Sequence, residues 1–520
     1  MDSMSSAAIP SARTSTGKSD QEMMNQNAIS DSVLSKVDSS IAQYVEEPVT
    51  KEEMARIRRK IDIHLLPLMM ITYFIQFLDK STIGNVAILG LQKSTHLTVS
   101  QYNWLGTIFF VSYLLFEYPQ NLALQRFPVG KWISLNAFAW AIFVALQASC
   151  KNFIQLFFCR FFLGACEGCA TAGFMITTSM FYTHQEQGLR TGFWFLMSGL
   201  SVAAGSFISY GVLHIKPTIM EPWQWFFVII GIVTFLVAVA LYLFFPDSPT
   251  TAWFLTPEER IKAVSRLRVN CTGIENKKFK KYQAIEAFKD PKTWMWFTYC
   301  ILATIPNISH QQALIIKAIG YDVFQTSLLT SVIGFVQSSA ILLGVALVRF
   351  FKDSRSNVAV AMSTVNLIGA ICSIALPWSN RVGLLIAIYL NLFQSAAFVI
   401  TIGWLTATTA GHTKRITVQA FVLTGYCIGN IIAPQLWQSK YKPRNIVPWS
   451  IITFCYVFGA LILIFMRFYL KRQNFIRDSK ITNQVIVNKQ KENENENEDK
   501  SVKAFMDLTD LENSDYRYVL

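Results

Sequence analysis

The chain alternates between long apolar segments and shorter polar ones. Twelve apolar segments of roughly twenty residues can be marked, and each could cross the hydrocarbon core of a bilayer as an α-helix. Six precede a long polar stretch and six follow it. This layout predicts an all-α membrane protein with twelve transmembrane helices in two six-helix bundles. The segments cover residues 64–84, 101–121, 131–150, 154–176, 190–213 and 224–246, and then 292–314, 326–348, 357–377, 383–405, 416–438 and 447–470.

The polar stretches divide the chain into five predicted regions. We expect a disordered N-terminal tail with a basic collar over residues 1–60 and the first bundle over 61–248. A central loop follows over 249–290, then the second bundle over 291–470 and a disordered tail over 471–520. Both tails are expected to be disordered because their composition offers little apolar surface to bury.

The central loop contains a helix-start signal. Thr256 is a favoured N-cap residue, Pro257 suits the first helical position, and Glu258 and Glu259 complement the positive end of the helix dipole. A short amphipathic helix on the membrane surface is therefore expected within this loop.

Charge fixes the predicted orientation. With twelve spans, both tails lie on one side, together with the basic collar, the basic central loop and Lys471. The positive-inside rule makes that side the cytoplasm, although Lys440, Lys442 and Arg444 on the outer side weaken the contrast. The net charge of +13 is then interpreted as membrane-anchoring charge rather than a nucleic-acid footprint, in a chain that is 52% hydrophobic and only 15% charged.

Motifs for other kinds of chemistry are missing from the sequence. It has no Walker loop, no HExxH and no nucleophile elbow, so neither ATP-driven pumping nor an enzyme is expected. The nine cysteines are scattered, and the lone CxxC of Cys166 and Cys169 lies inside an apolar segment without a second pair. We expect no cofactor and no bound metal, no nucleic-acid partner, and a monomer in the lipid bilayer.

The most informative residues are charges inside the apolar segments. A charge at membrane depth is costly and usually faces a protein interior or a water-filled cavity. Arg160 and Glu167 are seven residues apart, about two helical turns, so they share one helix face with Gly164 between them. Asp79 and Lys80 lie in the first span, at about the depth of Arg160, whereas Glu167 would lie about 10 Å deeper, near the midplane.

This charge layer predicts a site for an anion and a proton. Arg160, helped by Lys80, would bind the carboxylate of a substrate, because a guanidinium suits bidentate recognition. Glu167 and Asp79 are the candidates for proton coupling, since buried carboxyl groups can alternate between neutral and charged forms. Two plainer interpretations stay open: Asp79 pins two helices by pairing with Arg160 or Lys80, and Glu167 is a hydrogen-bonded packing residue.

Other polar positions could line the same path. The seventh span carries Asn307, His310 and Gln311 near its outer end, and the tenth carries Asn391 and Gln394 near mid-depth. These five are candidate substrate-binding residues, although a lone histidine at a helix end is also typical of an interfacial residue. At the inner end of the second span, a gate is predicted from Glu117 and Arg126.

Several of these motifs resemble a known family. The stretches 78–85, 160–168 and 246–260 are similar to the fungal anion:cation symporter branch of the major facilitator superfamily. The stretches 280–290 and 305–307 bring the resemblance close to the allantoate permease group. The loop after the second span departs from the Gly…Asp-Arg pattern that is usual in the superfamily. It keeps the basic residue, Arg126, but has no aspartate before it. The resemblance covers nearly all of residues 50–470.

The resemblance implies twelve helices with alternating access, a cavity lined by the first, fourth, seventh and tenth spans, and a plasma-membrane address. It also implies proton-coupled uptake of a small organic anion, such as allantoate, nicotinate or another carboxylate. The tails carry no clear sorting signal, so an internal membrane such as the endoplasmic reticulum is the alternative address. Two other functions stay open: a nutrient sensor with a transporter fold, and a facilitator for a neutral solute.

Overall fold

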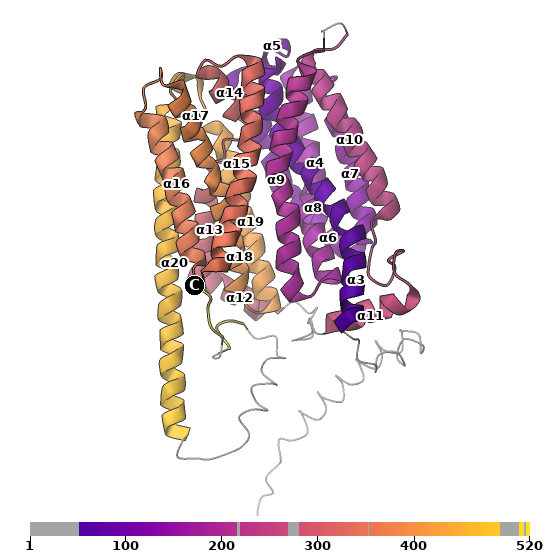
Figure 1. Ribbon diagram of the computed structural model, residues 1–520, viewed down its shortest axis with the longest axis vertical. Helices are drawn as coiled ribbons and strands as arrows, with labels where there is room; N and C mark the ends of the chain where they lie inside the picture. Colours follow the sequence, from indigo (N-terminus) through magenta and orange to yellow (C-terminus); the bar gives the residue numbers. More distant parts are fainter. Residues whose placement is uncertain (1–50, 216–218, 269–279, 352, 489–508, 514–515) are drawn as a thin grey trace, which may run out of the picture.

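The computed structural model describes residues 51–215, 219–268, 280–351, 353–488, 509–513 and 516–520, and every regular element in these ranges is a helix. The helices stand side by side in two groups (Figure 1). The first group contains α4 (Leu66–Ile88), α6 (Val99–Arg126), α7 (Val129–Gln147), α8 (Phe153–Phe181), α9 (His184–Val212) and α10 (Pro222–Phe244). The second contains α13 (Pro291–Thr304), α15 (Val323–Phe350), α16 (Arg355–Ala375), α18 (Gln394–Ala407), α19 (His412–Gln435) and α20 (Ile446–Asn488).

Ten helices of the described chain are long and apolar enough to cross a membrane. The protein is therefore a multi-pass membrane protein. The second and seventh predicted spans are not among the ten. The second corresponds to α6, which has 28 residues but carries Asn, Gln and Glu along its length. The seventh is divided between α13 and a separate short helix, α14 (Gln312–Ala318).

Two predicted spans are interrupted. In the seventh, α13 ends at Thr304 and α14 begins only at Gln312. In the tenth, α17 (Arg381–Leu390) and α18 are joined by the 3₁₀ turn η1 (Asn391–Phe393). Interruptions of transmembrane helices free backbone groups and polar side chains within the bundle, which is common where a transporter binds its substrate.

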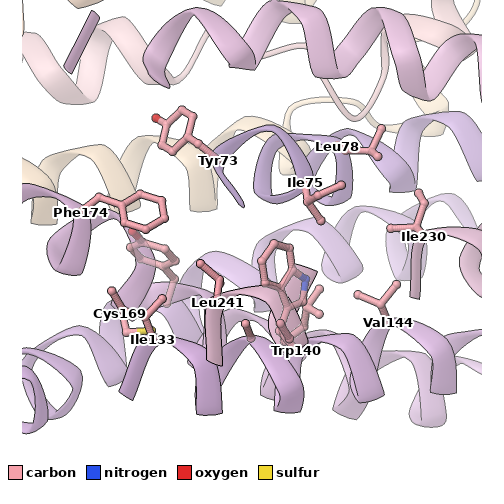
Figure 2. Close-up of a cluster of buried hydrophobic side chains, with 14 of the residues drawn as sticks. Tyr73, Ile75, Leu78, Ile133, Trp140, Val144, Cys169, Phe174, Ile230 and Leu241 are labelled. Atoms are coloured by element: carbon pink, nitrogen blue, oxygen red, sulfur yellow. The ribbon is translucent and has the colours of Figure 1, made fainter. Parts of the chain in front are cut away.

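The two groups touch along several helix pairs, one of which joins the short helix α14 to α4. α6 packs against α19, and α9 packs against α15. Within the first group, α6 lies along α8, α7 along α10, and α4 along α9. The core of this group includes Trp140, which Figure 2 shows among Ile75, Val144, Ile230 and Leu241. Its indole is almost fully buried, so its N–H needs an acceptor inside the bundle.

The predicted helix of the central loop is confirmed as α11 (Pro257–Arg268). Thr256 and Glu259 form the expected cap: the Glu259 amide donates to the Thr256 hydroxyl (3.3 Å), and the Thr256 amide donates to the Glu259 carboxylate (3.1 Å). Lys60 ion-pairs with Glu259 at 2.6 Å, which attaches α3 (Lys51–His64) to α11. A second short helix, α12 (Lys281–Lys289), ends the loop.

Both predicted tails are more ordered than expected. Residues 51–60 belong to α3, which is held by ion pairs to α11, including Lys262 to Glu53 at 2.5 Å. At the other end, α20 continues past the predicted boundary at 470 to Asn488, and it extends beyond the other helices in Figure 1. The final residues fold back onto the second group. The prediction of disorder was therefore wrong for these segments, because ion pairs and buried side chains such as Ile57 and Tyr518 hold them. Residues 1–50 and 489–508 lie outside the described chain.

Gly164 sets the approach of α8 to α6. A Cβ at this position would lie 2.3 Å from the backbone oxygen of Phe109, which is a severe clash with a main-chain atom. We expect Gly164→Ala to lower the free energy of unfolding by about 1–3 kcal/mol, since the two helices must separate. The change is measured as a lower thermal unfolding temperature of the purified protein in detergent.

The matched control is Gly192→Ala in α9, where an added Cβ meets nothing within 4 Å. It should leave the unfolding temperature unchanged or raise it slightly, because alanine favours helix more than glycine does. Equal unfolding temperatures for the two variants would contradict the close approach at Gly164.

Candidate substrate site

The predicted charge layer is buried between α4 and α8. Asp79 and Lys80 come from α4, and Arg160 and Glu167 come from α8. Asp79, Arg160 and Glu167 are 0%, 2% and 1% exposed, and the Lys80 side chain is 15% exposed. Two acids and two bases are thus withdrawn from solvent together, and their formal charges cancel. The structure brings together all four charged residues that the sequence pattern singled out.

Asp79 is held by an indole rather than by a base. One carboxylate oxygen accepts a hydrogen bond from Nε1 of Trp140 in α7 at 3.0 Å. The other oxygen has no hydrogen-bond partner among the described residues. Pairing of Asp79 with Arg160 or Lys80, the plainer interpretation, is not observed in this part of the chain. The Trp140 contact also gives the buried indole the acceptor that it requires.

Lys80 lies against Glu167 instead of joining Arg160. Its ammonium is 3.7 Å from Oε2 of Glu167 and also lies over the rings of Phe77 and Tyr113, at 5.0 and 5.5 Å from their centroids. A separation of 3.7 Å is an ion pair but is too long for a hydrogen bond. Neither carboxylate oxygen of Glu167 has a hydrogen-bond partner among the described residues. The Asp79 carboxyl group also lies close enough to Glu167 to interact with it, so the alternative that Glu167 is a packing acid stays open.

Arg160 carries unused donors in a buried place. Its Nε and Nη2 atoms are buried and have no hydrogen-bond partner among the described residues. Asp79, Glu167 and Tyr102 are close enough to interact with it electrostatically. A buried guanidinium without its hydrogen bonds is costly. An anion that accepted bonds from Nε and Nη2 would remove that cost in the paired geometry that arginine favours.

The candidates in the seventh span lie in its interruption and face two other helices. Asn307 donates to the side chain of Asn430 in α19 at 2.7 Å. His310 is buried, its carbonyl accepts a bond from the Tyr102 hydroxyl at 2.7 Å, and its ring lies edge-on to Phe110 of α6. The Gln311 side chain donates to Asn103 at 2.9 Å. His310 and Gln311 therefore connect the two bundles through α6, whereas Asn307 bonds within the second bundle.

The candidates in the tenth span bond within the second bundle. Asn391 donates to the carbonyl of Ala387 in its own span at 2.8 Å. Gln394 donates to the carbonyl of Ala303 in α13 at 3.1 Å and accepts from Asn366 in α16 at 3.0 Å. These contacts join helices of one bundle and do not reach the charged cluster.

The predicted gate pair is not brought together. Glu117 is half-buried in the middle of α6, whereas Arg126 is exposed at the last residue of that helix. The residue that ties this part of α6 to its neighbours is Gln120. It donates to the side chain of Asn136 at 2.8 Å and to the carbonyl of Ala165 at 3.0 Å, and it accepts from Trp132 at 2.7 Å. Glu117 and Arg126, the two residues of the predicted gate, are nine positions apart along one helix.

The family model of the Major Facilitator Superfamily matches residues 69–434, which is more than half of the chain. The chain belongs to the major facilitator superfamily. It is 30% identical over 520 residues to the high affinity cysteine transporter of Saccharomyces cerevisiae, covering 96% of this chain and 97% of that protein. It is 29% identical over 489 residues to the allantoate permease of the same yeast, covering 91% and 88%.

Solved structures of the superfamily share the fold. The xylose transporter XylE from E. coli, in a partially occluded inward open conformation, gives a TM-score of 0.60 at 13% identity and covers 77% of this chain and 98% of that chain. The superfamily assignment and the named relatives make this protein a transporter of the major facilitator superfamily. Its two groups of helices are the two bundles of that fold.

In this protein the two bundles are closed against each other at the end opposite α11 and α12. Besides the Tyr102 and Gln311 contacts, Asn103 donates to the carbonyl of Trp437 at 2.8 Å, and Thr107 donates to the carbonyl of Ile431 at 3.0 Å. Sequence reasoning missed Trp140, Tyr102, Asn103 and Thr107. A possible signal was the cluster of polar residues in the first turns of the second span, which would be unfavourable against lipid. Trp140 gave no such signal, since tryptophan is common in apolar spans.

Proposed function

We propose that this transporter carries a small organic anion with a carboxylate group into the cell together with a proton. The observation that carries the proposal is the pair of unused buried donors on Arg160, next to two carboxyl groups. A substrate carboxylate would accept from Nε and Nη2, and Lys80 would add a second positive charge nearby. The names of the two yeast relatives support recognition of a carboxylate, since allantoate is a carboxylate anion and cysteine is a zwitterion that carries one.

Glu167 is the proposed proton carrier, with Asp79 as the second candidate. An anion at Arg160 would repel an ionised Glu167 in a medium of low dielectric constant. Protonation of Glu167 removes that repulsion and releases Lys80 from its ion pair. Binding of the anion and of the proton would then favour each other, which is the thermodynamic requirement for coupled transport.

The proposed topology has twelve spans, with α6 and the interrupted seventh segment completing the ten apolar helices. Both tails would lie in the cytoplasm, on the same side as the basic residues of α3, α11 and α12. The proposed address is the plasma membrane, and the proposed unit is a monomer. Alternating access would require the hydrogen bonds from Tyr102, Asn103 and Thr107 to break when the outer end opens.

The test is uptake by purified protein in proteoliposomes. We expect labelled carboxylates from a panel of allantoate, nicotinate, pantothenate and cysteine to enter faster under an inward-directed proton gradient. A protonophore should remove the acceleration. Protein-free liposomes provide the background rate.

Three results would contradict the proposal in different ways. Uptake without any dependence on the gradient would indicate a facilitator. Saturable binding without uptake would indicate a sensor. Selective uptake of neutral solutes, retained when Arg160 and Lys80 are both neutralised, would reject the anion site.

A further inference from the structure

The last residues of the chain fill a polar site at the end of the second bundle. Residues 509–513 and 516–520 lie near α12, and the chain terminus is beside α20 in Figure 1. Their contacts reach α13, α16, α18, α19 and α20. This site is separate from the charged cluster between α4 and α8.

Asp510 lies at the centre of these contacts. Its Oδ1 is 2.9 Å from the ammonium of Lys414 in α19, and its Oδ2 pairs with the ammonium of Lys292 in α13. Asp290 completes the cluster at 2.9 Å from Lys414 and 3.4 Å from Lys292. All four side chains are at most 4% exposed. Two buried lysines therefore share two buried aspartates, of which one comes from the chain end.

The hydroxyl of Tyr518 adds to the same site. It donates to Oδ2 of Asp510 at 2.6 Å, and its ring lies under the ammonium of Lys292 at 4.3 Å from the centroid. The Tyr518 amide and carbonyl both bond to the side chain of Asn474 in α20, at 2.9 and 2.8 Å. The chain end is thus oriented by its backbone as well as by its charge.

Further hydrogen bonds spread the attachment over the bundle. The indole of Trp404 in α18 donates to the carbonyl of Val519 at 2.7 Å, and the amide of Arg355, the first residue of α16, donates to the carbonyl of Leu520 at 3.1 Å. The Tyr516 hydroxyl donates to the carbonyl of Ala407, the last residue of α18, at 2.6 Å. The segment therefore links α20 to the ends of four other helices.

Two of these helices are halves of interrupted spans. α13 is separated from α14 by residues 305–311, and α18 is separated from α17 by η1. Such a half can bend independently of its partner when the bundle changes shape. Lys292 and Trp404 are the points at which the chain end attaches to these two halves.

We propose that residues 509–513 and 516–520 form a strap that makes α13 and α18 move as one body with α19 and α20. The strap would act on helix movement during transport, and it is separate from the charged cluster between α4 and α8. Without it, Lys292 and Lys414 would be left with Asp290 and the partly exposed Glu286 as their carboxylate partners. The two inner halves would then move separately, and transport would slow.

The strap stays charged at neutral pH. Burial alone would raise the pKa of Asp510, but Lys292 and Lys414 lower it from 3.8 to about 2, helped by the Tyr518 hydroxyl. A carboxyl group with a depressed pKa in the folded state contributes stability above its ordinary pKa and loses it as pH falls toward the folded value. Asp510 therefore holds the strap throughout the pH range in which a proton gradient acts.

The experiment compares Asp510→Asn with Asp478→Asn in the purified full-length protein. Asp478 also pairs with the strap, through Arg517 at 2.8 Å, but its side chain is 63% exposed, so that pair contributes little. Digestion by a carboxypeptidase, followed by intact mass, measures how often the chain end detaches. We expect about tenfold faster trimming of Asp510→Asn than of the wild type. Asp478→Asn should be trimmed at the wild-type rate.

A milder variant, Tyr518→Phe, keeps the ring and removes only the hydroxyl, so it tests the same site if Asp510→Asn fails to fold. We expect trimming about threefold faster than in the wild type. Wild-type trimming rates in both variants would overturn the proposal that this cluster holds the strap in place. A released strap with an unchanged unfolding temperature and an unchanged uptake rate would overturn its bracing role. Trimming requires no substrate, so failure of the proposed transport function would be recognised separately.

Discussion

Replacing Arg160 with alanine is expected to abolish substrate uptake while the protein still reaches the membrane. Two charge-assisted hydrogen bonds from Nε and Nη2 to a carboxylate would each contribute about 1.5–3 kcal/mol. Their combined loss corresponds to a decrease in affinity of at least about a hundredfold. Initial uptake rates of a labelled carboxylate, normalised to the amount of protein at the cell surface, measure the effect.

Arg160→Lys separates charge from geometry. Lysine keeps the positive charge, so the four-residue cluster stays neutral, but it cannot present the two parallel donors of a guanidinium. We expect uptake by this variant to be reduced by about tenfold or more at low substrate concentration. Arg472→Ala, at an exposed position of α20, serves as the control and should transport normally. Uptake by Arg160→Ala at the wild-type rate would reject Arg160 as the anion-binding residue.

Helical periodicity was sufficient to find the charged cluster. Arg160 and Glu167 had to share a face once the segment was interpreted as a helix, and the cost of burying charge indicated that this face points into the protein. The cap of α11 was equally accessible, because Thr256 and Glu259 act within four residues of chain. Both inferences depend on interactions whose geometry is set by one helix.

The partners of these residues could not be found in the same way. Asp79 bonds to Trp140 of another span, and Lys80 approaches Glu167 rather than Arg160. Depth along a helix does not determine the rotation of one helix against its neighbour, and that rotation decides which side chains meet. The interruption at residues 305–311 was also missed, although Pro306 and the polar residues that follow it were a local signal for a break in the helix.

The strap shows a different limit of prediction from sequence. The run of alternating Glu and Asn at residues 492–498 made the whole C-terminal tail resemble a disordered segment. The available signal for order at the chain end was its aromatic and aliphatic residues, which are unusual in a disordered tail. They are Tyr516, Tyr518 and Leu520. Their docking site is assembled from five helices, so no local pattern could identify it.

Replacing Glu167 with glutamine is expected to remove the dependence of uptake on the proton gradient. Glutamine resembles the protonated acid in shape and cannot titrate, so the substrate site would stay in its proton-loaded form. Substrate binding should be retained or strengthened, because the repulsion between Glu167 and the bound carboxylate is absent. Exchange of labelled for unlabelled substrate across the membrane should continue, whereas gradient-driven accumulation should fall to the background of protein-free liposomes.

Asp79→Asn is the matched comparison, because it neutralises the other buried acid of the cluster. An asparagine oxygen can still accept the Trp140 hydrogen bond, so the local packing of α4 against α7 is kept. If Glu167 carries the proton, the proton gradient should still accelerate uptake by the Asp79→Asn variant. Loss of gradient dependence in Asp79→Asn together with its retention in Glu167→Gln would assign the proton to Asp79. Retention in both variants would place the coupling outside this cluster, because no other acid lies beside Arg160 in the described chain.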